Sequence, residues 1–372
     1  SDPEYFDDLF DTMIPSLIVN GNWKYFGTLL DQIDGYASNE TTAKIAYIYG
    51  RLLQEGYIKK GKDTDIEIER AFTRALNCGI NPYYKILAAY RLGYSDDEMA
   101  RILCVYADNK DIPVNKSAEN LLLGYKYFGY PEKIYPEWQK LYKLGVSTEV
   151  SMELAQFLHD CGEWDHDYYP LSIRISARSA NITTKFLEKE ELKLIYPRFY
   201  SDLVTKYASE YEVDENLIYA LIRSESFFDE DVESTAGAVG LTQLMQLTGN
   251  DIAAKLKVKD FSLLDAETNI RFGTYYISEL ITRCDGSVLQ ALFSYNAGIT
   301  RVRRWLSSSM VEFGKKKNMP GDLFLETLPY SETREYGRKL VSASLYYEWL
   351  YFDETKSEEK RSFKDIVESF IY

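Results

Sequence analysis

One glutamate occupies a position in a predicted helix where the pattern calls for an apolar residue. Residues 215–228 follow Asp214, a good helix N-cap, and carry an apolar stripe formed by Leu217, Ile218, Leu221 and Ile222. Glu225 comes four residues after Leu221 and is expected on the same buried face. A carboxyl in apolar surroundings has a raised pKa and stays protonated, as a general acid requires. Because many helical glutamates are simply solvated or ion-paired, periodicity alone leaves both interpretations open.

A loop bracketed by two glycines follows this helix. Residues 229–233 form an acidic run that we expect to be a solvated turn. Ser234 lies between that run and a tight connection bracketed by Gly237 and Gly240, where a ligand could approach the backbone closely. Gln243 and Met245, predicted at the start of the next helix, could supply an amide and a soft apolar contact. The alternative is an ordinary helix–loop–helix connection.

Two later segments place polar side chains at helix ends. Ser287 is expected to cap a helix that ends near Tyr295 and Asn296, just before Gly298. Side chains at such an end can open onto a cleft. Glu332 belongs to a Glu-Thr-Arg run that opens a helix extending to Trp349.

The first half of the chain contains a repeat that would position this chemistry. A glycine follows an apolar helical segment at intervals of 35, 37, 36 and 33 residues, at Gly21, Gly56, Gly93, Gly129 and Gly162. Each is expected to be a left-handed C-cap at which the chain reverses. A period near 34 residues is typical of two-helix, tetratricopeptide-like repeats, which stack into a superhelix. Five unrelated helix ends with even spacing are the alternative.

Composition then divides the chain and sets its class as all-α. The repeat fades after about residue 180, which predicts a helical-repeat superhelix over 1–190 and a second helical domain over 191–352. Residues 353–372 are predicted to form a charged linker and a short amphipathic helix. That helix is expected to pack back on the protein through Phe363, Ile366, Val367, Phe370 and Ile371.

The net charge and the cysteine and histidine residues argue against several kinds of function. A net charge of -15 argues against nucleic acid as a partner, because phosphate binding needs clustered Lys and Arg. The four cysteines are widely spaced and are expected to be buried thiols. The two histidines, His159 and His166, are expected to be structural. We therefore expect neither a metal nor another cofactor.

Five ordered sequence blocks together resemble the catalytic domain of the soluble lytic transglycosylases. The blocks are Glu225-Ser226-Phe227-Phe228, Ser234 through Met245, Asn269 through Gly273, Tyr295 through Gly298 and Glu332 through Tyr336. The resemblance implies a lysozyme-like α domain with a sugar-binding groove and Glu225 as its catalytic acid. It assigns substrate contacts to Ser234, Gln243, Met245, Tyr295, Asn296 and Glu332. Gln246 departs from the usual proline of the family, and Gly337 from a usual aliphatic residue.

The resemblance also suggests how an enzyme with a single catalytic carboxyl could work. Most glycosidases use two carboxylates, yet only Glu332 is a serious second candidate here, because residues 229–233 are expected to be exposed. The family pattern implies that the substrate N-acetyl group assists and that the sugar 6-hydroxyl attacks, giving a 1,6-anhydro product. Ser234 and Tyr295 would orient substrate groups. Phe228 and Met245 would form an apolar wall that keeps Glu225 protonated.

Two rival functions remain open from the sequence. A goose-type lysozyme-like hydrolase would use water on the same fold, and a non-catalytic helical-repeat scaffold would bind cell-wall enzymes or other proteins. Peptidoglycan as substrate implies the periplasm or cell envelope, with the export signal absent from this chain. We expect a monomer, with the repeat domain offering a surface for a protein partner.

Overall fold

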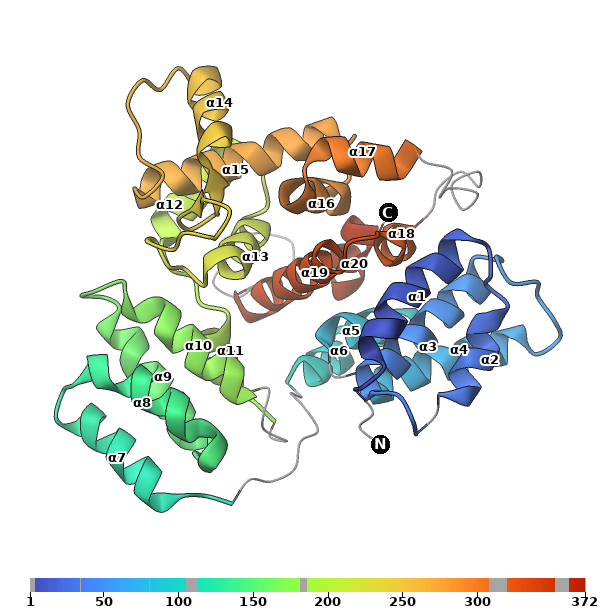
Figure 1. Ribbon diagram of the computed structural model, residues 1–372, viewed down its shortest axis with the longest axis horizontal. Coiled ribbons are helices and arrows are strands. Elements are labelled where there is room, and N and C mark those ends of the chain that lie inside the picture. The colour runs from blue at the N-terminus through green and yellow to red at the C-terminus, as the bar shows by residue number, and fades with distance from the viewer. Residues whose placement is uncertain are drawn as a thin grey trace. The chain divides into compact units, whose positions relative to one another are not determined.

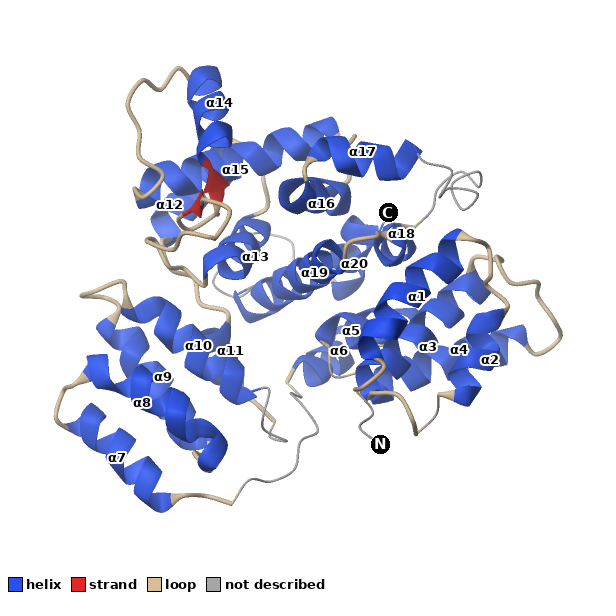
Figure 2. Ribbon diagram, in the orientation of Figure 1, coloured by secondary structure: helices blue, strands red, loops and turns tan. Residues whose placement is uncertain are grey.

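The computed structural model is all-α, as the sequence predicted, apart from one short hairpin (Figures 1 and 2). It describes residues 4–33, 35–79, 81–104, 113–180, 186–307, 320–351 and 361–371. The first ten α-helices are α1 Asp7–Val19, α2 Tyr25–Gln32, α3 Asn39–Gln54, α4 Thr64–Cys78, α5 Pro82–Arg91, α6 Asp96–Leu103, α7 Lys116–Tyr127, α8 Pro131–Leu141, α9 Thr148–Cys161 and α10 Tyr168–Ala180. A 3-10 helix, η1 Tyr142–Leu144, follows α8.

The remaining elements carry the candidate site. They are α11 Lys189–Ile195, α12 Ser201–Glu210, α13 Glu215–Ser226, β1 Ala238–Val239, β2 Leu244–Met245, α14 Gln246–Leu256, α15 Ala266–Arg283, α16 Val288–Ala297, α17 Ile299–Ser307, α18 Gly321–Thr327, α19 Ser331–Tyr351 and α20 Phe363–Ile371.

The chain folds into two compact units. Unit 1 comprises Ser1–Leu103, Glu279–Leu345 and Ser357–Tyr372, and unit 2 comprises Cys104–Ser278 and Tyr346–Lys356. Each unit is described by itself below. Both combine segments that are distant in sequence, so the predicted domain boundaries at residues 190 and 352 remain predictions.

Four of the five repeat glycines end their helices in the predicted left-handed conformation. Gly21, Gly56, Gly93 and Gly129 have φ between 71° and 78° and close α1, α3, α5 and α7. At each, the amide of the following residue donates to the carbonyl five residues earlier, and the glycine amide donates to the carbonyl three residues earlier. This is the Schellman motif, which satisfies the last carbonyls of a helix and reverses the chain.

The prediction of a left-handed cap is wrong for Gly162. This residue caps α9 with φ -61°, an ordinary right-handed conformation. A Cβ at Gly162 would lie 2.2 Å from the ring of Tyr169 on α10. The glycine is therefore required by the close packing of α9 against α10 and not by the backbone angle.

Buried charges connect the repeat helices of unit 1 to its later segments. Arg51 on α3 donates through Nε to the Asp322 carboxylate of α18 at 2.6 Å, and Tyr47 donates to the same oxygen at 2.6 Å. One turn further along α18, Glu326 accepts from Tyr84 of α5 at 2.8 Å and from Arg338 of α19 at 2.6 Å. These side chains are almost fully buried, so α18 and the part of α19 up to Leu345 are integral to this unit.

The C-terminal helix packs back on the protein, as predicted. All five predicted apolar residues of α20 are at most 8% exposed, and the helix contacts α5, α16 and α18 of the same unit. Tyr90 of α5 also donates to Glu368 at 2.7 Å. Most of the predicted charged linker lies outside the described residues.

In unit 2, the helix that carries Glu225 is held at both its start and its side. Asp214 caps α13 as predicted and accepts from the amide of Asn216 at 2.8 Å. The Asn216 amide side chain accepts from Arg198 at 2.7 Å and donates to Glu348 at 2.5 Å. Tyr219, one turn along α13, stacks on Tyr347 with ring centroids 5.4 Å apart. None of the helices described is long and apolar enough to span a bilayer.

Candidate active site

Glu225 lies in the last turn of α13, half-buried and not fully buried as the stripe predicted. Leu217, Ile218, Leu221 and Ile222 do form the buried stripe, each at most 3% exposed. The helix ends one residue after Glu225, and Phe227 then adopts φ 56°. Glu225 therefore combines partly apolar surroundings with access from outside.

The neighbouring Ser226 ties this end of α13 to the following loop. Its side chain is buried, and its hydroxyl lies 2.9 Å from the carbonyl oxygen of Leu241 and 3.1 Å from that of Ile222. The same oxygen accepts from the amide of Phe228 at 3.0 Å. Ser226 therefore connects the end of α13 to the following loop, a role that the sequence did not reveal.

The loop forms a small β-hairpin, so the alternative of an ordinary helix–loop–helix connection is wrong, as is the predicted place of Gln243 and Met245 at the start of the next helix (Figure 2). Ala238 pairs with Met245 and Val239 with Leu244, so Gln243 lies in the turn and Met245 in β2, before α14 begins. The Ser234 hydroxyl accepts from the amide of Ala238 at 2.9 Å. The hairpin places Ser234 and Met245 next to the same strand end.

Gln243 has a structural task inside this loop. Its backbone has φ 48°, and its side-chain nitrogen donates to the carbonyls of Val232 and Gly240, both at 3.0 Å. Since the amide nitrogen serves the loop, a ligand contact from Gln243 would use its oxygen.

The two predicted wall residues differ in exposure. Met245 is 42% exposed, as a contact surface would be. Phe228 has no exposed surface and packs edge-on against Phe199 and parallel to Tyr200, with centroid distances of 5.3 and 6.4 Å. Phe228 is therefore packed inside the protein, where it supports the turn after α13, and it cannot contact a sugar.

Asn269, which opens one of the five sequence blocks, organises the hairpin. Its oxygen accepts from the amide and hydroxyl of Thr242 at 2.8 and 2.6 Å. Its nitrogen donates to the carbonyls of Val239 and Leu263 at 3.0 and 2.7 Å. The side chain is 1% exposed, so every hydrogen bond of a buried amide is used.

Two motif glycines leave room for this network. A Cβ at Gly240 would lie 2.3 Å from the Asn269 nitrogen, and a Cβ at Gly273 would lie 2.4 Å from the Thr242 hydroxyl. Gly240 also has φ 75°, which disfavours other residues. The spacing of Asn269 and Gly273 by one helical turn was the available signal, since both face the same loop.

The acidic run after α13 is only partly solvated. Asp229 is half-buried and pairs with Arg174 at 3.3 Å, while Glu230 lies 2.7 Å from His166 and accepts from Tyr200. Burial and this bond to Glu230 raise the pKa of Tyr200. The expectation of an exposed turn is therefore wrong for Asp229 and Glu230. It holds for Asp231 and Glu233.

Tyr295, Asn296 and Glu332 belong to unit 1, whereas Glu225 and the hairpin belong to unit 2. Tyr295 and Asn296 are half-buried at the end of α16, and Asn296 accepts from the hydroxyl of Thr333 at 2.8 Å. Glu332 is exposed in the first turn of α19. Unit 1 thus brings Asn296 together with the Glu-Thr-Arg run.

Comparison with known proteins decides the family. Residues 202–318 match the family described as the transglycosylase SLT domain. Membrane-bound lytic murein transglycosylase C of Yersinia pestis (strain Pestoides F) is 35% identical over 262 residues, which cover 65% of this chain and 67% of that protein. The chain belongs to the lytic transglycosylase family. The resemblance expected from the five blocks is confirmed.

Other lytic transglycosylases extend the comparison over the fold. The soluble lytic murein transglycosylase of Escherichia coli (strain K12) is 28% identical over 276 residues, 73% of this chain and 39% of that protein. The crystal structure of the 70 kDa soluble lytic transglycosylase from Escherichia coli is 22% identical and superposes with a TM-score of 0.68 over 96% of this chain and 52% of that one. The chain thus has this fold but spans only about two fifths to half of these relatives.

The two departures from the lytic transglycosylase pattern have local explanations. Gln246 is the first residue of α14, the helical position at which proline is best tolerated, and its amide instead donates to Asn250 at 3.0 Å. A Cβ at Gly337 on α19 would lie 2.7 Å from the Phe293 ring. A larger residue at 337 is therefore excluded by the size of Phe293.

Proposed function

We propose that this chain cleaves the β-1,4 bond between N-acetylmuramic acid and N-acetylglucosamine in peptidoglycan, leaving 1,6-anhydro-N-acetylmuramic acid ends. The observation that carries the proposal is the placement of Glu225. It is a half-buried carboxyl at the end of α13, beside a hairpin that Ser226 and Asn269 hold in place. The family to which the chain belongs supports the substrate class.

Glu225 would act first as an acid and then as a base. Its proton passes to the glycosidic oxygen as the bond from that oxygen to the anomeric carbon breaks. The carbonyl oxygen of the substrate N-acetyl group stabilises the anomeric carbon meanwhile. The Glu225 carboxylate then takes the proton of the sugar 6-hydroxyl, and that oxygen bonds to the anomeric carbon. The acid is regenerated, and no water is consumed.

The surroundings of Glu225 favour this single-carboxyl scheme. Glycosidases that use two carboxylates place them about 5 to 10 Å apart across the bond. Here the sequence-adjacent carboxylates of Asp229 and Glu230 are engaged by Arg174 and by His166 and Tyr200. They are poorly suited to act as a second catalytic group.

We propose six substrate contacts, each described within its own unit. In unit 2 these are the Ser234 hydroxyl, the Gln243 oxygen and the exposed Met245. In unit 1 these are Tyr295, Asn296 and Glu332. Ser234 and Tyr295 would orient the N-acetyl and hydroxyl groups of the sugar. The described residues contain no cluster of ligating side chains that could hold a metal ion, and the scheme uses none. A peptidoglycan substrate would place the protein in the periplasm or cell envelope.

The deciding experiment compares Glu225→Gln with Glu233→Gln on purified sacculi. Both variants remove one carboxylate near the hairpin, but Glu233 is exposed and takes no part in the proposed scheme. We expect Glu225→Gln to lose about 100- to 10,000-fold in rate, the range for a general acid, and Glu233→Gln to match the wild type. The products, weighed by mass spectrometry, should be anhydro-muropeptides.

Each contrary outcome identifies a different error. Substantial activity in Glu225→Gln would sink the assignment of the acid. Products heavier by one water would indicate a hydrolase of the goose-type lysozyme kind. Binding of sacculi without any release of products would indicate a non-catalytic scaffold.

A further inference from the structure

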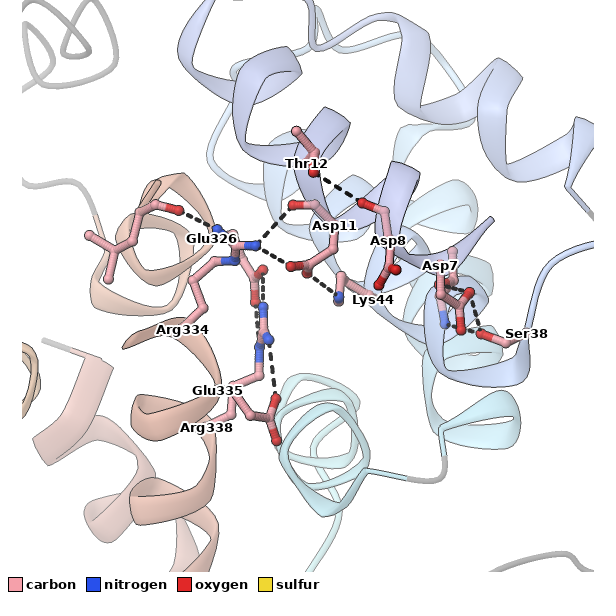
Figure 3. Close-up of polar contacts among 12 residues, drawn as sticks. Asp7, Asp8, Asp11, Thr12, Ser38, Lys44, Glu326, Arg334, Glu335 and Arg338 are labelled. Atoms are coloured by element: carbon pink, nitrogen blue, oxygen red, sulfur yellow. Dashed lines mark hydrogen bonds and ion pairs between the residues drawn. The ribbon is translucent and has the colours of Figure 1, made fainter. Parts of the chain in front are cut away.

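In unit 1, the N-terminal helix is tied directly to the Glu-Thr-Arg run of α19. Arg334 is 2% exposed and donates to the backbone oxygen of Asp11 on α1 at 2.9 Å. It also donates to the Asp11 carboxylate and to the carbonyl of Leu328, which precedes α19 (Figure 3). Arg334 thus makes its hydrogen bonds within the protein, to α1 and to the segment that leads into α19.

The same carboxylate reaches a third helix. Lys44 on α3 donates to the other oxygen of Asp11 at 3.0 Å, so the carboxylate lies between Lys44 and Arg334 (Figure 3). Burial alone would raise the pKa of Asp11, but these two cations lower it overall. Asp11 is therefore ionised and connects α1, α3 and α19. Most residues of α3 are buried, so Lys44 extends from a helix of the core.

Three consecutive residues of α19 differ in what their side chains contact. Arg334 binds Asp11, Thr333 binds Asn296, and Glu332 is exposed. Glu332 is thus the one residue of the run whose side chain faces solvent, next to two that are anchored. The run also borders a cavity of about 370 Å³, with Ser331 and Arg334 on one wall and Thr12 and Ser16 of α1 on the other. A ligand can therefore reach the place where α1 meets α19.

Asp11 is not needed to hold α19 as a whole. One turn further on, Arg338 pairs with Glu326 at 2.6 Å and with Glu335 at 3.4 Å, and neither of these ion pairs uses a side chain of α1 (Figure 3). Those contacts keep the helix packed when Asp11 is neutralised. What Asp11 adds is confined to the first turn, which carries Glu332. An effect of Asp11 on stability alone would not depend on Glu332.

We propose that Asp11 is a positioning residue for glycan binding, which acts through Arg334 to fix the first turn of α19 and with it Glu332. The inference rests on the proposed function, because it takes Glu332 as a substrate contact. It gives the N-terminal helix a part in substrate binding. The helix is thus more than a support for the second half of the chain.

The test compares Asp11→Asn with Asp8→Asn. Asp8 lies on the same helix, is exposed, and accepts the Thr12 hydroxyl through its backbone oxygen. Both changes remove one charge, but only the first breaks the ion pair with Arg334. Binding of a soluble N-acetylglucosamine oligomer is measured in a Glu225→Gln background, and KM and kcat for solubilised glycan strands are measured with Glu225 intact. We expect Asp11→Asn to raise Kd and KM about tenfold with kcat little changed, and Asp8→Asn to change neither.

A double-mutant cycle with Glu332→Gln separates positioning from general support. If Asp11 acts through Glu332, its replacement costs little once Glu332 is already changed. An equal loss in both backgrounds would overturn the inference, as would equal affinities of Asp11→Asn and Asp8→Asn. If Asp11→Asn does not fold, Arg334→Lys replaces it, because lysine keeps the charge but cannot reach Asp11 and Leu328 together. Absence of anhydro products from the wild type, with the Kd shift still present, would refute the proposed reaction alone.

Discussion

At the scale of single residues, the candidate site depends on the buried side-chain amide of Asn269 as well as on Glu225. The Asn269 amide makes three hydrogen bonds to the hairpin, at Thr242 and Val239, and a fourth to Leu263, just before α15. Thr242 lies 27 residues before Asn269 in the sequence. A pattern of apolar residues can show that a glutamate occupies a position where an apolar residue is expected. It carries no information about hydrogen bonds between such distant residues.

Replacing Asn269 by Asp should damage both stability and activity. The carboxylate would keep the acceptor for Thr242 but would face the carbonyls of Val239 and Leu263 with an oxygen and not a donor. We expect the free energy of unfolding in urea to fall by about 2 kcal/mol, the cost of leaving buried polar groups unsatisfied. The exposed Asn250→Asp on α14 is the control. Equal stability of the two variants would show that the network contributes nothing.

At the scale of elements, the sequence predicted the helices well and their ends less well. Helical periodicity and the caps at Asp214 and Ser287 sufficed for α13 and α16, because these signals are local. The hairpin was missed, since each of its strands has only two residues and is held by contacts with Asn269. Gly162 fits the 34-residue repeat as well as the other four glycines do. Only the closeness of the Tyr169 ring shows that Gly162 is required for a different reason, the lack of space for a Cβ.

Substitution by alanine should distinguish the two kinds of glycine. In Gly56→Ala the added Cβ would meet no atom within 4 Å. The alanine backbone must nevertheless adopt the left-handed conformation, which costs about 1 to 2 kcal/mol. Gly162→Ala keeps an ordinary backbone but collides with the Tyr169 ring. In a double-mutant cycle followed by urea unfolding, Tyr169→Leu should therefore relieve Gly162→Ala and leave Gly56→Ala unchanged. Strict additivity at Gly162 would contradict a steric role.

At the scale of the whole molecule, unit 1 is built from three segments that the sequence assigned to three different domains. Its interior contains ion pairs between α3 and α18 and between α18 and α19. Residue composition marks where a repeat fades, but it does not reveal which later segment the repeat helices bind. The acid Asp322 is 1% exposed and is surrounded by Tyr47 and Arg51 of α3 and Arg91 of α5. A fragment that lacks α3 would leave this carboxylate without Arg51.

Acid should weaken this arrangement through Asp322. Burial raises the pKa of Asp322, but Arg51 and Arg91 outweigh it, so the folded pKa lies below the unfolded value of about 3.9. A lowered folded pKa adds stability that is present above the unfolded pKa and is lost as pH falls through the folded pKa. Unfolding by urea between pH 2 and pH 6 should therefore show a decline below about pH 4 that is shallower in Asp322→Asn. At pH 6 that variant should lose about 3 to 5 kcal/mol, because Arg51 stays buried and keeps only the partly exposed Glu55 as a counter-charge. The exposed Asp65→Asn of α4 is the control, and an Asp322→Asn protein with the same pH profile as the wild type would contradict the assignment.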